Sequence, residues 1–285
     1  MEKIPIRNIR ATEKPALGQF SIRKLQDILG GKDLRHELHR HSFFFILAVS
    51  EGKGIHEIDF KSYKVANKSI FFLRPGQVHR LQLMAGSIGY IVEFDNQFYR
   101  SKDTSSAQRL RKASSKNFCE LEARSFEKLH TILGSIIDEY TSKQEGYLDI
   151  IKADLEIFCI ELNRQSTNPK HFAKNENLYT QERFEQFIEL LENKISEMKN
   201  VSQYADLLNL SAYQLNAITK SSVGKTAAQL IDEQIILEAK RHLLATSNQV
   251  KDIAWDLGYE DVSYFIRFFK KKTRRSPDVF RKNFN

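Results

Sequence analysis

The feature that most constrains this chain is an internal repeat near its C-terminal end. Residues 201–230 align with residues 250–280 at a spacing of 49, which becomes 50 after one extra residue in the second copy. The matching pairs are Val201 and Val250, Ala205 and Ala254, Leu208 and Leu257, Leu215 and Phe265, Ile218 and Phe268, and Lys220 and Lys270. Two copies are too few for a stacked solenoid. The pattern therefore predicts one structural module used twice.

Each copy is typical of a short helix, a tight turn and a second helix. The turn at residues 258–260 is followed by Asp261, and the turn at residues 209–210 is followed by Ser211. Asp and Ser are favoured helix N-caps because their side-chain oxygens accept a free backbone N–H. This is the layout of a helix-turn-helix, whose second helix enters the DNA major groove. We predict such modules at about residues 201–223 and 250–273.

A connecting helix is predicted between the two modules, at residues 230–245. At 1.5 Å per residue it would be roughly 24 Å long. A helix of that length could hold the two recognition helices about 34 Å apart, which is one turn of DNA. One chain could then read two successive segments of the major groove.

The positive charge is concentrated at the same end of the chain. The net charge is +8, and residues 262–285 carry eight cations and one acid, a balance of +7. A basic run by itself is most often a solvated surface, and excess charge alone indicates only anionic partners or solubility. Two modules that both end in basic turns favour DNA. A nonspecific DNA-binding protein is an alternative, and it predicts equal affinity for promoter and random DNA at matched salt.

The recognition helices supply the candidate DNA contacts. The positions expected on their exposed fronts are Tyr213, Gln214, Asn216, Ala217, Val262, Ser263, Ile266 and Arg267. Asn and Gln suit adenine, whereas Arg suits guanine or a phosphate. The cations expected to hold phosphates, which position the protein without specifying sequence, are Lys220, Lys225, Lys270, Lys271, Arg274 and Arg275. Phe265, Phe268 and Phe269 have the spacing of a buried stripe and are predicted to be core.

The second module also resembles a known family. Residues 253–271 (IAWDLGYEDVSYFIRFFKK), with the later Ser-Pro and Phe-Arg pairs, resemble the C-terminal hallmark of AraC-type transcription regulators. The resemblance covers residues 179–285 and implies a DNA-binding domain with two helix-turn-helix modules. At matched positions it implies DNA contacts by Tyr213, Asn216, Ala217, Val262, Ser263, Tyr264 and Arg267.

Two positions depart from the family pattern. Ala217 stands where the family often has a cation, so the first module is expected to read fewer bases directly. Arg274 stands where the first copy has Gly224 and the family usually has glycine, which takes the left-handed conformation at a helix end. Either the second module ends differently, or Arg274 accepts a conformation that costs roughly 1 kcal/mol for an added phosphate contact. We expect the first.

The N-terminal half follows a different period. Between residues 20 and 94, short β-rich runs alternate with turns, which is typical of a barrel or sandwich. Residues 125–140 and 147–164 place apolar residues at helical spacing. We predict an α+β chain of two domains. A domain at residues 1–165 has a cupin-like barrel at about 15–100 and helices at about 104–165, a linker follows at 166–178, and an all-α DNA-binding domain occupies 179–285.

Histidines mark the predicted barrel. His39 and His41 form a His-x-His pair on one strand, and His79 follows a Pro-Gly turn, an arrangement that resembles the two motifs of the cupin barrel. Metal-binding cupins add a Glu about four residues past the second His, where Phe45 stands here. Three interpretations stay open: structural or surface histidines, a dry pocket for a small effector, and a metal centre. The candidate effector-binding residues are His39, His41, Phe43, Phe45, Phe72 and His79.

Taken together, these features predict a cytoplasmic, sequence-specific transcription regulator that responds to a small-molecule effector through its barrel. The longest apolar run is too short to span a bilayer, no secretory signal is visible, and the two cysteines form no framework. The expected partners are promoter DNA, the effector, a second copy of the chain in a homodimer and, as a further candidate, RNA polymerase. No membrane association, cofactor or metal is expected. The alternative is an enzyme, a cupin metal-dependent oxygenase or isomerase fused to a DNA-binding domain, with His39, His41 and His79 as ligands.

Overall fold

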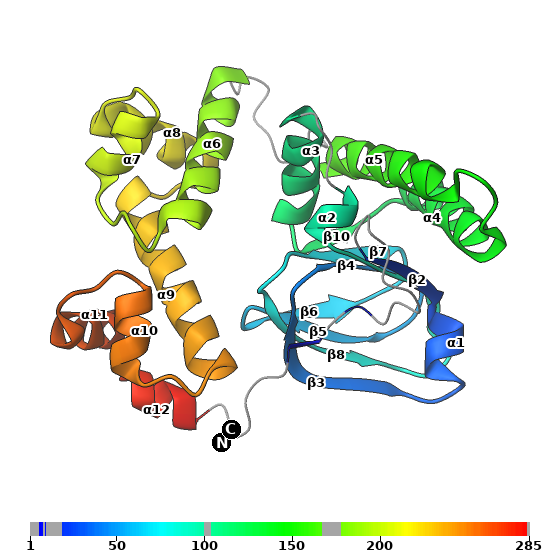
Figure 1. Cartoon of the computed structure of the whole chain (residues 1–285), viewed down its shortest axis with the longest axis horizontal. Coiled ribbons are helices and arrows are strands. Elements are labelled where there is room, and N and C mark those ends of the chain that lie inside the picture. Colours follow the sequence, from blue (N-terminus) through cyan, green and yellow to red (C-terminus); the bar gives the residue numbers. More distant parts are fainter. Residues whose placement is uncertain (1–5, 8, 10–18, 100–103, 167–177, 284–285) are drawn as a thin grey trace. The chain divides into compact units, whose positions relative to one another are not determined.

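The structure is a computed structural model, and it describes residues 6, 7, 9, 19–99, 104–166 and 178–283. These residues form two compact units, one running from β1 to α5 and the other from α6 to α12 (Figure 1). The predicted linker at residues 166–178 falls almost wholly outside the described residues and stays a prediction. Within the described part of the chain, no helix is long and apolar enough to cross a membrane.

The strands of the first unit form two sheets. Sheet A has the order β1-β3-β8-β5-β6 and sheet B the order β10-β7-β4-β9-β2, and the described pairs are antiparallel apart from the parallel pair β1–β3. The strands are β1 (Ile6–Arg7), β2 (Phe20–Lys24), β3 (Leu34–His41), β4 (Phe44–Glu51), β5 (Gly54–Ile58), β6 (Lys61–Val65), β7 (Ser69–Leu73), β8 (Val78–Leu83), β9 (Ile88–Phe94) and β10 (Phe118–Glu120).

Sheet B separates two apolar cores. Successive side chains of a strand point to opposite faces of the sheet, and on β4 this sends Phe44 and Ile46 one way and Phe45 and Leu47 the other. The first pair packs with helical residues such as Phe158, in the core beneath the helices. The second pair packs with side chains from sheet A, in the core between the two sheets. The β4 sequence is apolar throughout because both of its faces are buried.

Helices cover the outer face of sheet B (Figure 1). The helices of this unit are α1 (Leu25–Leu29), α2 (Asn96–Tyr99), α3 (Thr104–Ser115), α4 (Ala123–Ser142) and α5 (Tyr147–Ser166). Glu156 on α5 accepts hydrogen bonds from Tyr99 and Arg109, and Asn163 Nδ2 donates to the Arg109 carbonyl oxygen (3.0 Å). These contacts tie α2 and α3 to α5.

The second unit is helical in its described part. Its helices are α6 (Leu178–Lys194), α7 (Val201–Leu207), α8 (Ala212–Val223), α9 (Ala227–Ala245), α10 (Val250–Asp256), α11 (Val262–Thr273) and α12 (Pro277–Lys282). The connecting helix α9 begins three residues before the predicted start, because Thr226 and Gln229 form a capping box there. Helices α7 and α8 form the first helix-turn-helix, and α10 and α11 form the second.

The predicted fold class is confirmed: a two-sheet, cupin-like domain with helices is followed by a helical domain with two helix-turn-helix modules. The predicted extent of the barrel was too short, because β10 adds an edge strand to sheet B beyond residue 100. A strand of three residues between two helices carries too little periodicity for the sequence to reveal it.

Candidate functional site

The two helix-turn-helix turns have the same backbone geometry. The Leu210 N–H donates to the Ala205 carbonyl oxygen (2.9 Å), and the Tyr259 N–H donates to that of Ala254 (2.8 Å). Both alanines are fully buried, and their small side chains let the two helices of each module approach closely. The residue just before each of these N–H donors has a left-handed backbone, with φ of 53° at Asn209 and 73° at Gly258. Asn and Gly are the residues that adopt this conformation most readily.

Each recognition helix begins at the predicted cap. The Gln214 N–H donates to the Ser211 hydroxyl (3.1 Å). The Ser263 and Tyr264 N–H groups donate to Asp261 Oδ1, at 2.7 and 3.1 Å. These side chains fix where the second helix of each module starts. They thereby set which residues lie in the first turn, the part of a recognition helix that meets base edges.

Helix α11 separates a core face from an exposed face. Phe265 and Phe269 are fully buried, and Phe268 is half-buried against Tyr259. Ser263, Tyr264 and Arg267 are exposed, and Arg267 Nη2 lies 3.7 Å from Asp261 Oδ2, a loose ion pair that DNA could replace. Val262 is half-buried. The exposed cations that follow on the helix end and the next turn are Lys270, Lys271, Arg274 and Arg275.

Helix α8 offers a smaller set of contacts than predicted. Asn216 Nδ2 donates to the Ala212 carbonyl oxygen (3.0 Å), and Asn216 Oδ1 accepts the Ala227 N–H (3.0 Å). The Oδ1 contact ties α8 to the start of α9, and the Nδ2 contact stays within α8. The amide is thus engaged within the protein, and base reading by Asn216 stays a prediction. Gln214 Oε1 accepts the Ser211 N–H (2.8 Å) as part of a capping box, so only its NH2 group could serve DNA.

The remaining front of α8 is Tyr213, Ala217 and Lys220, all exposed. Tyr213 is the most prominent of them, with 83% of its surface exposed. Ala217 occupies the position that Arg267 holds in the second module and has no hydrogen-bonding group. Lys225, which sequence reasoning placed with the phosphate-binding cations, forms an ion pair with Glu233 (2.7 Å).

Arg274 ends α11 in the left-handed conformation, with φ of 63°, as Gly224 ends α8 with φ of 72°. The Arg274 N–H donates to the Lys270 carbonyl oxygen (2.8 Å), and the Gly224 N–H makes the equivalent bond to Lys220 (2.9 Å). The expectation that the second module ends differently was therefore wrong. The two helices end alike, and Arg274 accepts the backbone strain that glycine avoids.

Substituting Arg274→Gly is expected to raise the free energy of unfolding of the helical unit by about 1 kcal/mol, because it relieves the left-handed strain. The control is Arg274→Ala, which removes the same cation but keeps a Cβ. The measurement is urea unfolding followed by the fluorescence of Trp255, the single tryptophan of the chain. Equal stabilisation by both variants would instead point to relief of repulsion among the neighbouring cations.

A cluster of buried histidines lies between the two sheets. His39 and His41 come from β3 and His79 from β8, where His39 and His79 are direct cross-strand partners. Sequence reasoning missed a fourth member, His56 on β5, which is fully buried. His56 Nε2 lies 2.8 Å from His79 Nδ1, and His79 Nε2 lies 2.7 Å from His41 Nε2. The alternating pattern of residues 54–58 could have placed His56 on the inner face.

Burial disfavours the charged form of two of these imidazoles, His56 and His79. It lowers the pKa of His56 to about 3, with a further contribution from the neighbouring His39 and His36. It also lowers the pKa of His79 well below its ordinary value, and His56, His39 and His41 add to the effect. A neutral imidazole has one N–H and one lone pair, so the cluster can donate to, or bind, groups that a charged histidine would repel.

Phenylalanines close the cluster on one side. The Phe43 and Phe45 rings lie 4.3 and 5.4 Å from that of His41, centroid to centroid. Phe45 thus fills the place where a cupin carboxylate was sought. Phe72 does not belong to this group, because it faces the helices on the other side of sheet B. This corrects its prediction as a wall of the barrel interior, an error that one residue of register suffices to cause.

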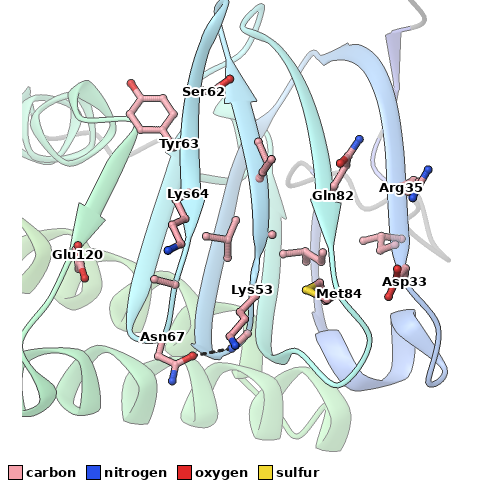
Figure 2. A pocket seen from close by; sticks show the side chains of 17 residues that line it. Asp33, Arg35, Lys53, Ser62, Tyr63, Lys64, Asn67, Gln82, Met84 and Glu120 are labelled. Atoms are coloured by element: carbon pink, nitrogen blue, oxygen red, sulfur yellow. Dashed lines mark hydrogen bonds between the residues drawn. The ribbon is translucent and has the colours of Figure 1, made fainter.

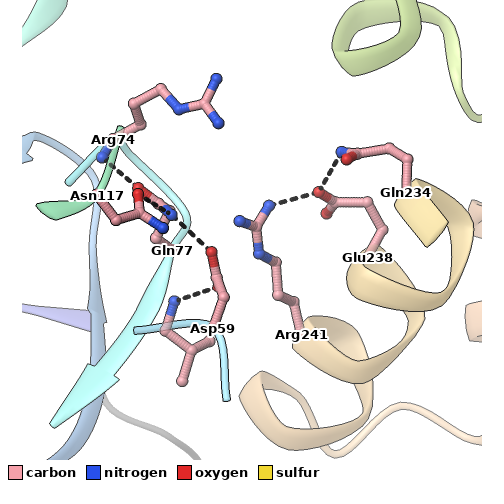
Figure 3. Close-up of polar contacts among 8 residues, drawn as sticks. Asp59, Arg74, Gln77, Asn117, Gln234, Glu238 and Arg241 are labelled. Atoms are coloured by element: carbon pink, nitrogen blue, oxygen red, sulfur yellow. Dashed lines mark hydrogen bonds and ion pairs between the residues drawn. The ribbon is translucent and has the colours of Figure 1, made fainter. Parts of the chain in front are cut away.

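The turn before His79 is held by Gln77, which is almost fully buried (Figure 3). Its Nε2 donates to Asp59 Oδ2 (2.6 Å) and Asn117 Oδ1 (3.0 Å), and its Oε1 accepts the Arg74 N–H (2.7 Å). Gln77 therefore connects β8 to the β5–β6 turn beside the cluster.

In the helical unit, Glu238 on α9 accepts hydrogen bonds from Gln234 Nε2 (3.2 Å) and Arg241 Nη1 (2.5 Å), which are also drawn in Figure 3.

Both units match families of known proteins. Residues 204–283 match a helix-turn-helix domain family, and residues 29–112 match the AraC-like ligand binding domain. The uncharacterized HTH-type transcriptional regulator YfiF of Bacillus subtilis is 22% identical over 250 residues, 86% of this chain and 78% of YfiF. The HTH-type transcriptional activator RhaS of Pectobacterium atrosepticum is 22% identical over 267 residues, 85% of this chain and 86% of RhaS. The chain belongs to the AraC-type transcription regulators.

The two family matches correspond to two functional domains of this AraC-type regulator. The helix-turn-helix match contains both recognition helices, and the ligand-binding match contains all four histidines of the cluster. The regulator thus carries a DNA-binding domain and a ligand-binding domain in one chain. Among solved structures, it is similar to ToxT from Vibrio cholerae, bound to an unsaturated fatty acid. That structure is 18% identical and covers 94% of this chain and 96% of its own, with a TM-score of 0.41.

The ligand-binding domain of this AraC-type regulator also has an open groove of about 1050 Å³ over sheet A (Figure 2). Its lining has three cations, Arg35, Lys53 and Lys64, and two acids, Asp33 and Glu120. Ile55 and Met84 add apolar surface. The predicted effector-binding residues do not line this groove. A ligand therefore has two candidate places, the packed histidine interior and the groove.

Proposed function

We propose that this AraC-type regulator reads promoter DNA unequally with its two modules. The second module carries direct base recognition through Arg267, Ser263, Tyr264 and Val262. The first contributes Tyr213, Ala217, Lys220 and the NH2 group of Gln214. The observation that carries this proposal is the contrast at one matched position, where Arg267 is exposed in the second module and Ala217 stands in the first.

The cations at the end of α11 are proposed to hold the DNA backbone. Lys270, Lys271, Arg274 and Arg275 are exposed and lie together on the last turn and the loop beyond it. Phosphate contacts of this kind supply affinity and register without sequence preference. Lys272 is set apart from them, because it forms an ion pair with Asp232 on α9 (2.5 Å).

The N-terminal domain is proposed to respond to an effector bound at His39, His41, Phe43, Phe45 and His79. Such an effector would shift an existing equilibrium between arrangements that bind DNA and arrangements that do not. This requires different effector affinities in the two. RNA polymerase, which works beside a regulator bound at a promoter, is a further proposed partner.

The proposed reading mode is tested by selecting sequences from random DNA with the full chain, with and without cell extract. We expect an enriched site whose best-defined positions fall within one half, the half read by the second module. Extract containing the effector should change affinity for that site. Recovery of sequences without any preference at matched salt would support the nonspecific alternative.

A second copy of the chain is proposed to dock on α5. Ile150 and Ile157 are seven residues apart on this helix, on one face, and remain 43% and 46% exposed. Substituting Ile157→Glu is expected to weaken self-association more than tenfold, because burying one isoleucine contributes about 1.5 to 3 kcal/mol. Sedimentation velocity measures this. The control is Ile55→Glu, at an isoleucine on β5 that is 52% exposed; loss of the dimer in the control alone would place the interface on sheet A.

A further inference from the structure

The segment between α6 and α7, residues 195–200, is held on the first helix-turn-helix module. Tyr204 on α7 is fully buried, and its hydroxyl donates to the Met198 carbonyl oxygen (2.9 Å). Gln203, also on α7, accepts the Lys199 N–H through its Oε1 atom (3.1 Å). Helix α6 itself packs against α7 and α8. The segment is therefore fixed to the first module from both of its ends.

The same segment touches the turn of the second module. Gly258 has no side chain where the Ser196 carbonyl oxygen approaches, and a Cβ added there would lie 1.8 Å from that oxygen. Lys199 Nζ lies 5.0 Å from the centroid of the Tyr259 ring and donates to the Ser196 carbonyl oxygen (3.1 Å). One lysine thus contacts both the backbone of its own segment and an aromatic ring in the second turn.

The surroundings of Lys199 favour this contact. Burial lowers the pKa of Lys199, so its ammonium group is partly withdrawn from water. Among the described residues, no carboxylate forms an ion pair with it. The face of a tyrosine ring attracts a cation, and the attraction is stronger when the cation is desolvated. The Tyr259 ring and the Ser196 carbonyl are therefore the groups that hold the ammonium in place.

This contact joins the two modules at a second point. Helix α9 runs between the modules and packs against helices of both (Figure 1). Asp232 on α9 also forms an ion pair with Lys272 on α11 (2.5 Å). Residues 246–249 separate α9 from α10, and with α9 as its only attachment the second module could pivot about them. The contact of residues 195–200 with the second turn restrains that pivot.

We propose that Lys199 is a positioning residue, which fixes the second recognition helix relative to the first and so sets the spacing of DNA subsites that the chain accepts. The inference rests on the proposed function, in which both modules bind one duplex. The two helices would read major-groove segments one turn, about 34 Å, apart. One added base pair moves the second segment by about 3.4 Å and rotates it by about 35°. A fixed pair of helices loses contacts on such DNA, whereas a pair that can pivot keeps part of them.

The first test measures the affinity of the full chain for the selected DNA site and for the same site with one base pair inserted between its subsites. The ratio of the two affinities is the spacing penalty. Lys199→Met removes the ammonium and keeps the apolar stem. It is expected to reduce the penalty about 2- to 30-fold, the range for losing one cation–π contact. Lys199→Arg keeps a cation that stacks on aromatic rings and should preserve the penalty.

A matched control removes a nearby lysine that does not reach the second module. Lys194→Ala, at the end of α6, breaks an ion pair with Glu197 and should leave the penalty unchanged. If Lys199 instead holds a phosphate, Lys199→Met weakens both sites alike and lowers the salt slope by about one. An unchanged penalty in folded Lys199→Met, checked by circular dichroism, overturns the proposal. Lys199→Gln decides if Lys199→Met does not fold.

The second test needs no DNA. Spin labels on cysteines that replace the exposed Ser221 on α8 and Lys271 on α11 report the distance between the recognition helices by double electron–electron resonance. Cys119 is replaced by serine, and Cys159 is buried and stays unlabelled. We expect one narrow distance distribution that broadens in Lys199→Met and stays narrow in Lys199→Arg. An unchanged distribution in Lys199→Met overturns the positioning role, whatever the chain does to DNA.

The two tests also keep this inference apart from the proposed function. A chain whose distance distribution broadens in Lys199→Met but that selects no DNA sequence overturns the proposed promoter reading and leaves the geometry held by Lys199 standing. A chain that selects a DNA site while the distribution stays unchanged keeps the promoter reading and loses the positioning role.

Discussion

Substituting Gly258→Ala is expected to lower the free energy of unfolding of the helical unit by about 2 to 5 kcal/mol. Gly258 has φ of 73°, and a Cβ added there would lie 1.8 Å from the Ser196 carbonyl oxygen. The left-handed conformation costs an alanine about 1 to 2 kcal/mol, and forcing an atom into a packed site costs about 1 to 3 more. The clash is with backbone rather than with a flexible side chain, so the turn between α10 and α11 must move.

Gly224→Ala is the matched control. Gly224 has nearly the same φ, 72°, but a Cβ there would meet nothing within 4 Å. It should therefore show the conformational cost alone, about 1 kcal/mol. Urea unfolding followed by Trp255 fluorescence reports both, because this tryptophan lies on α10 beside the second turn. Equal losses in the two variants would show that the contact with Ser196 contributes nothing.

Substituting Arg267→Ala is expected to weaken binding to the preferred DNA sequence by about 1 to 3 kcal/mol, or roughly 5- to 150-fold. Arg267 is exposed in the first half of α11, about one turn before Lys270 and Lys271. Its guanidinium can bind guanine O6 and N7 together, which alanine cannot replace. Preference at one base position should flatten. The measurement is affinity for the selected site and for single-base variants of it.

Lys271→Ala separates base reading from backbone binding. This lysine is exposed on the last turn of α11, and replacing it by alanine should weaken binding to all DNA sequences alike. The slope of log affinity against log salt should fall by about one. If Arg267→Ala behaves in the same way, Arg267 holds a phosphate. If neither variant changes binding, α11 does not face DNA.

Much of the DNA-binding unit could be predicted from the sequence because its information is local. Helix periods, the caps Ser211 and Asp261, and the repeat at 49 to 50 residues all reside in short stretches of chain. The roles of Asn216 and Arg274 could not be predicted in the same way. An amide on the front of a helix has the same sequence signature whether it faces DNA or, as here, binds the N–H of Ala227 eleven residues away.

In the N-terminal domain, too, local features could be predicted from the sequence and contacts between strands could not. Its strands, and the position of His39 and His41 on one face of the same strand, follow from local alternation. Which residue lies opposite another depends on strand register, which no single strand encodes. Register placed Phe72 against the helices and brought His56 to His79, from a strand that sequence analysis had not connected with the histidine motifs.

The sequence by itself therefore determined the modules, the basic end of α11 and the membership in the AraC-type family, because each depends on residues close together in the chain. Only the tertiary structure decided which polar side chains are already engaged within the protein, which glycine has a backbone atom against it, and which four imidazoles meet between the sheets. Those properties arise from contacts between residues far apart in sequence, and the chain must fold before they exist.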